Sequence, residues 1–361
     1  MSGWREARTI AALRLDNIGD VIMLGPAIRA IKETSPAARI TLIASRAGAA
    51  AAPLLPWVDD VMVWRPVWQD VGGRIPFDPA REQALIADLA ARRFDAALIF
   101  TSFSQTPHVP GYVCYLAGIP LRAGESKEFG GSTLTDELRG APDDLHQAER
   151  NLRLVEHLGF PVRDRRLAVA LPPEAYAAVP RLLAAARLDP GAPFVLLHPG
   201  ASAAARQVPV ALAAGLARLL AEAGWPVLVT GLEREADLVA AVVDGAGPRV
   251  RPLVGRTTLA EYAALVARAA LVVCGNTLPL HLADALDTPV LALYSGTDLD
   301  AQWRPRHTRS RLLRRPTACH PCYLFDCPIG QPCLDIPPEE AAAAALELLV
   351  GAGAGVAGGE R

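Results

Sequence analysis

The stretch Thr9–Asp20, which reads TIAALRLDNIGD, decides the fold class. Its first part, Thr9–Leu15, is short and mostly apolar, as expected for a buried strand. A polar turn with a glycine follows, and residues 18–33 then carry apolar side chains at helical spacing. A buried strand that passes through a tight turn into a helix is typical of a parallel α/β sheet.

The same alternation continues along the chain and restarts in its second half. We expect further strands at 39–44, 61–64, 96–101, 194–198, 227–230, 271–274 and 290–294. We expect further helices at 81–93, 146–158, 209–223, 233–243, 259–268 and 281–286. Strands that alternate with helices form parallel sheets covered on both faces, and ligands bind beyond the carboxyl ends of such strands.

Prolines become frequent between the two halves, at 161–193, and 361 residues are enough for two domains. The sequence therefore predicts an α/β fold of two Rossmann-like domains, 1–175 and 176–350, with parallel sheets that face a central cleft. The glycine-rich end, 351–361, is predicted to be a flexible tail.

Composition excludes several classes of protein. The net charge of -2 argues against a general nucleic-acid binder, which would carry a basic surplus. The N-terminus lacks the pattern of a signal peptide, and no stretch reaches the roughly 20 apolar residues of a membrane span. We therefore expect a cytoplasmic location.

Four cysteines crowd into residues 319–333: Cys319, Cys322, Cys327 and Cys333. Their spacing is compatible with a structural zinc or iron–sulfur site, and disulfides or free thiols are the alternatives. The segment is far in sequence from the polar loops described next, so we interpret it as structural.

Two carboxylates follow the first strand. Asp16 and Asp20 flank Gly19 in a turn without a G-x-G-x-x-G pattern or a P-loop lysine, which argues against a dinucleotide or NTP site. Either carboxylate could take a proton from an attacking hydroxyl, or could simply cap the following helix.

Two polar loops follow strands of the second half. The segment 198–202, HPGAS, is followed by Arg206, and backbone amides with a guanidinium could stabilise a departing diphosphate. Alternatively Gly200 makes an ordinary turn and Arg206 is solvated. The segment 275–281, GNTLPLH, opens a helix whose first amides form an anion site. There Thr277 could cap the helix or bind an oxygen, and His281 could bind phosphate or be a buried, hydrogen-bonded side chain.

These motifs, in this order, resemble glycosyltransferase family 9, the ADP-heptose:lipopolysaccharide heptosyltransferases. Residues 13–21, LRLDNIGDV, resemble the family's R-x-D-x-x-G-D start, and HPGAS resembles its H-P-G-A-S segment. Residues 275–283 and 296–298 lie where its D-[ST]-G-x-x-H-x-A and G-x-T-D segments occur. The resemblance covers nearly the whole chain.

The resemblance implies a GT-B fold, with the acceptor on the first domain and an ADP-sugar donor on the second. It implies inverting transfer to a lipopolysaccharide-core or related glycan or glycolipid, without a required cofactor. An acceptor carried on lipid would bring peripheral contact with the inner membrane face. Asp20 matches the catalytic base, with Asp16 and Gly19 beside it on the acceptor side, and Arg206 matches the diphosphate-neutralising position. The implied donor-binding residues are Gly200, Ser202, Glu233, Asn276, Thr277, Leu278 and His281.

Two positions depart from the family pattern. Asn276 replaces an aspartate, which removes a charge that could help to hold the sugar. Leu278 replaces a glycine, which restricts positive φ and crowds a phosphate. These departures keep open a different nucleotide-sugar and acceptor, or a member that binds a nucleotide-sugar without turnover.

Overall fold

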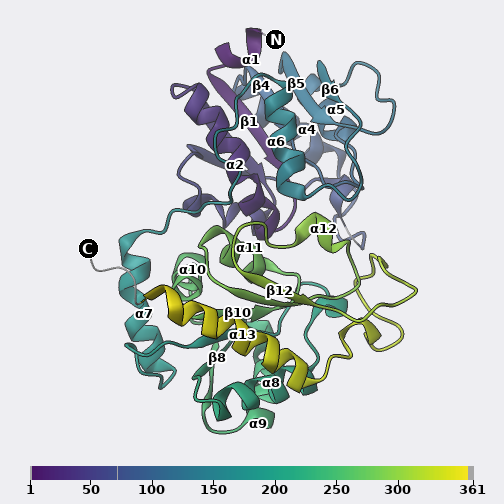
Figure 1. The fold of residues 1–361 in the computed structure, drawn as a ribbon. Coiled ribbons are helices and arrows are strands. Elements are labelled where there is room, and N and C mark those ends of the chain that lie inside the picture. The colour runs from purple at the N-terminus through teal and green to yellow at the C-terminus, as the bar shows by residue number, and fades with distance from the viewer. Residues whose placement is uncertain (1, 71, 357–361) are drawn as a thin grey trace. The chain divides into compact units, whose positions relative to one another are not determined.

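The computed structural model describes residues 2–70 and 72–356, and the chain divides into two compact units, Met1–Ala170 and Leu171–Arg361. Figure 1 shows that each unit is a sheet covered by helices. We call them unit 1 and unit 2 and describe each by itself.

Unit 1 contains a six-stranded parallel sheet in the order β3-β2-β1-β4-β5-β6. Its strands are β1 (Thr9–Arg14), β2 (Arg39–Ala44), β3 (Asp60–Val63), β4 (Ala96–Ile99), β5 (Leu121–Glu125) and β6 (Asp136–Leu138). Its helices are α1 (Ser2–Glu6), α2 (Ile18–Thr34), α3 (Arg46–Ala49), α4 (Pro79–Ala91), α5 (His108–Leu116) and α6 (Gln147–His157). Short 3-10 turns lie at Ala52–Leu54 and Val67–Gln69.

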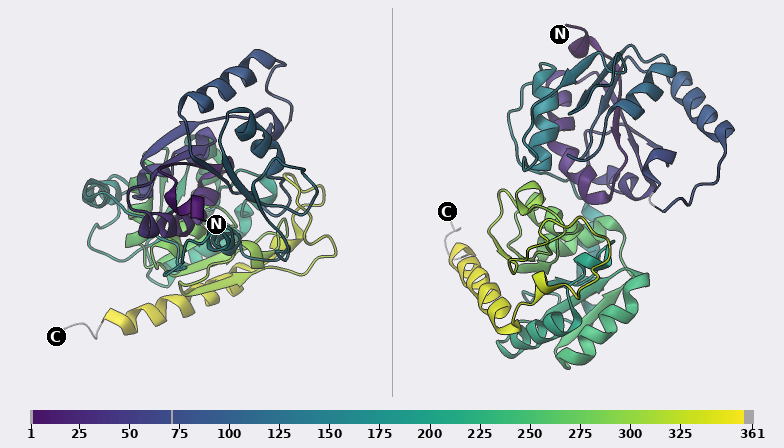
Figure 2. Two further views of the ribbon diagram at one scale, coloured as in Figure 1. Left: turned by 90° about the horizontal axis from the view of Figure 1, so that it is seen from above. Right: turned by 90° about the vertical axis from the view of Figure 1, so that its right-hand side faces the viewer.

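The central strand β1 positions the polar loop that follows it. Residues 10–14 of this strand are buried, because β1 lies between β2 and β4 and helices cover both faces. Helices α2 and α6 pack on each other on one face, and α4 and α5 lie on the other, as the right-hand view of Figure 2 shows. The carboxyl ends of β1, β4 and β5 therefore lie at one edge of the sheet.

Unit 2 repeats this plan in a six-stranded parallel sheet with the order β12-β11-β10-β7-β8-β9. Its strands are β7 (Val195–His198), β8 (Val227–Gly231), β9 (Val250–Val254), β10 (Leu271–Cys274), β11 (Val290–Leu293) and β12 (Ser310–Leu313). Its helices are α7 (Pro173–Ala185), α8 (Val210–Glu222), α9 (Ala236–Ala246), α10 (Leu259–Arg268), α11 (Leu278–Ala285), α12 (Asp300–Trp303) and α13 (Pro338–Val356). Its 3-10 turns lie at Ala204–Arg206, Glu233–Glu235 and Pro332–Leu334.

Small and branched apolar side chains build the core of unit 2. Alanines and leucines of α8, such as Ala213, Leu216 and Leu220, pack against sheet residues such as Val229 and Val273. Alanine allows helices to approach closely, and α8 contacts both α9 and α13. By length and composition alone the segment Ala204–Glu222 could cross a membrane, but half of it is buried inside the unit. That burial is what a core helix shows.

The structure adds elements that the sequence pattern did not predict, namely α1, α3, α5, β5, β6, α7, β9, α12, β12 and α13. Helix α7 lies in the proline-rich stretch. It forms there because Pro173 occupies its first turn, where no backbone N–H is needed. Helix α13 includes residues 351–356 of the predicted tail at 351–361. Residues 357–361 lie outside the described residues.

Candidate functional site

The loop between β1 and α2 places two carboxylates around one buried guanidinium. Arg14, the last residue of β1, has no exposed side-chain surface. Its Nη2 atom donates to Oδ1 of Asp20 at 2.9 Å, and its Nε atom lies 3.0 Å from Oδ2 of Asp16. Both carboxylates remain partly accessible, with 16% of the Asp16 side chain and 13% of the Asp20 side chain exposed. They can therefore meet a ligand.

Asp20 also serves the helix that it begins. Its Oδ2 atom accepts a hydrogen bond from the backbone N–H of Asn17 at 3.1 Å, which satisfies a free amide at the start of α2. Gly19 lies buried in the same first turn. The capping role is thus confirmed for Asp20. It does not exclude chemistry, because a carboxylate offers about four lone-pair sites.

Asp16 lies in a different electrostatic environment. Burial raises the pKa of its carboxyl, and the negative charge of Asp20 raises it further. The Arg14 guanidinium and a 2.7 Å hydrogen bond from Nε2 of Gln105 work against this rise in the pKa.

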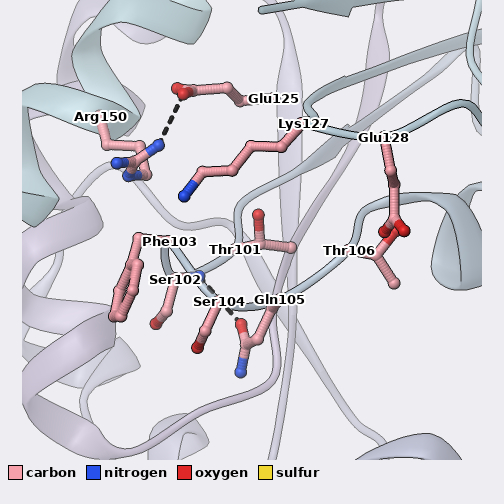
Figure 3. Close-up of a pocket in the computed structure, with 10 residues that line it drawn as sticks. All are labelled: Thr101, Ser102, Phe103, Ser104, Gln105, Thr106, Glu125, Lys127, Glu128 and Arg150. Carbon is pink, nitrogen blue, oxygen red and sulfur yellow. Dashed lines mark hydrogen bonds and ion pairs between the residues drawn. The ribbon is translucent and has the colours of Figure 1, made fainter. Parts of the chain in front are cut away.

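A polar cavity of about 330 Å³ lies beside these carboxylates, at the carboxyl ends of β4 and β5. Figure 3 shows Ser102, Phe103, Ser104 and Gln105 along one side of it. The other lining residues are Thr101, Thr106, Glu125, Lys127, Glu128 and Arg150. Two of its residues contact the β1–α2 loop directly. The Oγ atom of Ser102 accepts from Arg14 Nη2 at 3.0 Å, and Gln105 donates to Asp16.

In unit 2 the corresponding polar loops form one hydrogen-bonded network. Arg206 donates from Nε to Thr297 Oγ1 at 3.1 Å and from Nη2 to Asp298 Oδ1 at 3.0 Å. Asn276 donates to the same two residues, at 3.2 Å to Thr297 Oγ1 and at 3.0 Å to Asp298 Oδ2. Its own carbonyl oxygen accepts from the backbone and the hydroxyl of Ser295. Arg206 is thereby fixed with its Nη1 end free of these bonds.

Gly275, in the loop that leads into α11, lies against the backbone of this arginine. A Cβ atom on Gly275 would come within 2.7 Å of the Arg206 carbonyl oxygen, so only glycine permits this approach. Thr277 precedes the helix, and its Oγ1 atom is buried without a hydrogen-bond partner among the described residues. Leu278 is the first residue of α11 and does not adopt positive φ. The restriction that leucine places on positive φ therefore does not matter at this position, because helical backbone suits leucine.

His281 is buried one turn into α11. Burial lowers the pKa of its imidazole to about 4, and the nearby Arg206 lowers it too, while Asp284 opposes the shift. Its ring lies edge-on to Trp303, with 6.4 Å between centroids. The imidazole is therefore neutral near pH 7, and it can offer a ligand one N–H but not a positive charge.

The remaining predicted donor residues lie at the ends of β7 and β8. Gly200 is buried and Ser202 is exposed after β7, and Glu233 is exposed after β8. A Cβ atom on Gly200 would come within 2.5 Å of the buried Glu235 carboxyl group. Glu235 also accepts from the backbone of Leu232 at 2.8 Å, which orders the β8–α9 loop, and the same carboxyl group lies against Gly200 of the β7 loop.

Sequence reasoning assigned no role to four of these residues, although Asp298 lay in its G-x-T-D segment, 296–298. Asp298 and Glu235 hold the unit 2 loops together, and Ser102 and Gln105 hold the unit 1 loop. Asp298 had a usable signal, since it ends the polar turn after β11. The other three gave no sequence signal, because only the folded chain brings Ser102 to Arg14, Gln105 to Asp16 and Glu235 to Gly200.

Comparison with known proteins decides the family. The sequence model of glycosyltransferase family 9 (heptosyltransferase) matches residues 83–331. The chain belongs to glycosyltransferase family 9. The matched residues contain the cavity of unit 1 and all the polar loops of unit 2. The Asp16–Asp20 loop precedes them, so its role rests on its own motif and geometry.

Relatives of this family 9 glycosyltransferase agree in fold and class. A Haemophilus influenzae protein whose name provisionally calls it a glycosyltransferase is 24% identical over 313 residues, which are 82% of this chain and 85% of that protein. The structure of a family 9 glycosyl transferase from Veillonella parvula matches with a TM-score of 0.78 at 17% identity, over 95% of this chain and 98% of that one. Escherichia coli ADP-heptose lps heptosyltransferase II matches with a TM-score of 0.72 at 21% identity, over 95% and 99%. The two structures show the GT-B-like fold.

The cysteine segment of this family 9 chain does not assemble the predicted metal site. Cys319 is exposed, Cys322 and Cys327 are half-buried, Cys333 is buried in the unit 2 core, and all four are free thiols. Across residues 2–70 and 72–356, no three His, Cys, Asp or Glu side chains gather closely enough to hold a metal ion. Cys327 instead accepts a hydrogen bond from the backbone of Gln331 at 3.2 Å.

Proposed function

We propose that this glycosyltransferase moves heptose from ADP-heptose to a lipopolysaccharide-core or related glycan or glycolipid, with inversion at the anomeric carbon. The observation that carries the proposal is that the backbone of Arg206 lies against Gly275, in the loop that leads into α11. We infer that Arg206 and the first amides of α11 form a diphosphate site. The family membership and the ADP-heptose enzyme among the structural relatives support the choice of donor.

Unit 1 supplies the base in this proposal. Asp20 takes the proton of the acceptor hydroxyl as that oxygen attacks the anomeric carbon. We assign this role to Asp20 rather than to Asp16, because Asp20 occupies the position of the family's catalytic aspartate in the R-x-D-x-x-G-D motif. Arg14 orients the carboxylate of Asp20 through its 2.9 Å bond. Proton transfer of this kind contributes about 10²–10⁴-fold in rate.

Unit 2 supplies the leaving-group site. As the bond from the anomeric carbon to the diphosphate oxygen breaks, negative charge develops on the departing nucleoside diphosphate. The free Nη1 end of Arg206, the first amides of α11 and the Thr277 hydroxyl are placed to receive it. The neutral His281 adds one N–H donor. Glu233 and Ser202 are exposed at the same sheet edge and serve the nucleoside and the phosphate.

A nucleotide screen tests the donor. Thermal unfolding of the full chain is followed with ADP-, UDP-, GDP- and dTDP-sugars, and a ligand at 100 times its Kd stabilises by about 2.7 kcal/mol. We expect ADP-heptose to raise the Tm most. A larger rise in Tm with a UDP-, GDP- or dTDP-sugar would contradict ADP-heptose as the donor and would identify that nucleotide-sugar instead.

A different nucleotide-sugar is the second candidate, and Asn276 is the observation that favours it. Here the family's usual carboxylate is an amide that is fully engaged with Asp298, Thr297 and Ser295. Formation of product in the presence of a glycan acceptor separates an enzyme from a member that only binds.

We also propose that the protein acts in the cytoplasm and contacts the inner membrane face when its acceptor is lipid-linked. Cell fractionation tests that location.

A further inference from the structure

We propose that two adjoining hollows in unit 1 form a binding site for an uncharged saccharide of at least two residues. The polar hollow is the 330 Å³ cavity described above. The apolar hollow, of about 240 Å³, shares Thr101, Ser104, Gln105 and Thr106 with it. The inference rests on the proposed function and names the class of its acceptor.

The polar hollow offers hydrogen-bonding groups that suit sugar hydroxyls. The loop of residues 101–106, TSFSQT, places four hydroxyls and one amide in its lining. A hydroxyl both donates and accepts, as a sugar hydroxyl does, so such groups pair without a fixed charge. Ser104 is exposed and open to a ligand. The volume lies at the lower end of the roughly 300–1,000 Å³ range of small-molecule sites.

The charges of the polar hollow are balanced. Arg150 is buried and donates to Glu125 at 2.6 Å, as the dashed line in Figure 3 marks. Lys127 is paired with Asp143, and its ammonium lies 5.2 Å from the centre of the Phe103 ring. Glu128 adds a further carboxylate to the lining. A phosphate or carboxylate on a ligand would meet cations that already have partners, so an uncharged sugar is favoured.

The apolar hollow provides a surface for the C–H face of a sugar ring. Trp68 lines it, and this indole is held edge-on against the buried Trp64 with 4.9 Å between ring centroids. The remaining walls are largely apolar: Leu13, Leu15, Ile99, Phe100, Val109 and Pro110. One face of a pyranose carries mainly C–H groups, which pack against an aromatic ring as other apolar groups do.

The position of the hollows gives the site its role. Ser102 lines the polar hollow and accepts from Arg14, which holds Asp20. Gln105 lines both hollows and donates to Asp16 at 2.7 Å. A saccharide bound here therefore contacts the side chain that holds Asp16 and the side chain that bonds Arg14, and Arg14 in turn holds the Asp20 carboxylate that we propose as the base. A charged group elsewhere on the acceptor would not be recognised by this site.

Calorimetry on the full chain tests the class of ligand. The probes are neutral gluco-, galacto- and manno-configured trisaccharides, and the same trisaccharides carrying one phosphate monoester. We expect at least one neutral probe to bind, its phosphate form to bind no more than threefold tighter, and 0.5 M NaCl to change Kd less than twofold. Binding of the phosphorylated probes alone, a tenfold loss in salt, or no binding by any probe would overturn the inference.

Matched variants locate the site. Trp68→Leu and Ser104→Ala should each raise the Kd of the neutral probe, by at least tenfold for Trp68→Leu. Phe77→Leu removes an aromatic ring that is 97% exposed and lies outside both hollows, and should leave Kd unchanged. Binding as tight as in the parent, both by Ser104→Ala and by folded Trp68→Leu, would contradict the assignment.

If the probes bind but no nucleotide-sugar is consumed, the proposed function fails and this inference stands. If transfer occurs and both variants keep the parent's acceptor KM, this inference fails and the proposed function stands.

Discussion

Arg14 donates to Asp20 at 2.9 Å from a side chain with no exposed surface, and the same guanidinium lies 3.0 Å from Asp16. One buried cation thus orients two carboxylates at the end of the central strand. The arrangement presents a carboxylate in a fixed direction, which is what a general base requires.

Replacing Arg14 should destabilise the protein strongly. Arg14→Met leaves two partly buried carboxylates without their cation, and breaking a buried pair in this way costs about 3–5 kcal/mol. Urea denaturation of the variant measures the loss. The control is Arg218→Met, which breaks an exposed pair with Glu222 at 3.7 Å and should change the free energy of unfolding by less than about 0.5 kcal/mol. Equal stability of the two variants would contradict the buried pair.

Restoring the family's aspartate at position 276 should be unfavourable in this chain. Asn276→Asp places a second carboxylate where the amide now donates to Asp298 at 3.0 Å. Two carboxylates this close share a proton, so the apparent pKa of the pair rises above its unfolded value. The stabilisation is then present at low pH and is lost as pH rises through the raised value. Denaturation at pH 5 and pH 8 should show the variant losing more stability than the parent at the higher pH.

The control for this variant is the exchange Asn276→Asp/Asp298→Asn, which again pairs one amide with one carboxylate. It should recover most of the stability at pH 8. A single variant as stable as the parent at both pH values would show that positions 276 and 298 do not interact.

His281 should stay neutral through the physiological range. Burial lowers the pKa of its imidazole to about 4 in the folded chain, against about 6.5 in an unfolded one. The unfolded state therefore binds the extra proton first, and the folded state loses stability as pH falls from about 6.5 to 4. In His281→Gln this part of the acid sensitivity should disappear. An NMR titration of the parent that gives an imidazole pKa near 6.5 for His281 would refute the assignment.

A methyl group at position 200 should lower stability and weaken nucleotide binding by unit 2. In Gly200→Ala the new Cβ would meet the Glu235 carboxyl group at 2.5 Å, and forcing extra atoms into such a packed site costs about 1–3 kcal/mol. The displaced loop should also bind the nucleotide more weakly. Gly191→Ala is the matched control, because its nearest neighbour lies 3.5 Å away. Calorimetry measures the affinity of both variants for ADP. Indistinguishable affinities would argue against a role for this loop in nucleotide binding.

The sequence predicted best the elements whose apolar pattern is uninterrupted. Strands β2 and β10 and helix α10 have the predicted bounds, because each is a short apolar run or a clear helical repeat. Strand β6, Asp136–Leu138, was missed because a polar edge strand carries little apolar signal. Helix α7 was missed because prolines at 173 and 180 read as a linker.

The candidate site also contains parts that the sequence predicted and parts that it missed. The loops were predictable, because polar residues after buried strands of a parallel sheet gather at one edge. Their partners were not, because the fold alone brings Gln105 to Asp16 and Glu235 to Gly200. The role of Asn276 also depended on the structure. The sequence showed only a lost charge, whereas the folded chain shows an amide that pairs with Asp298.

The central claim is that Asp20 is the base, and single-turnover transfer from ADP-heptose to a glycan acceptor tests it most directly. Asp20→Asn keeps the size of the side chain and an oxygen for Asn17, so the protein should fold and bind ADP-heptose with unchanged Kd. Its rate of transfer should fall by about 10²–10⁴-fold. The matched variant Asp16→Asn should retain transfer within about tenfold of the parent, since loss of a base alone accounts for larger effects. A full rate in Asp20→Asn, or a greater loss in Asp16→Asn, would contradict the account.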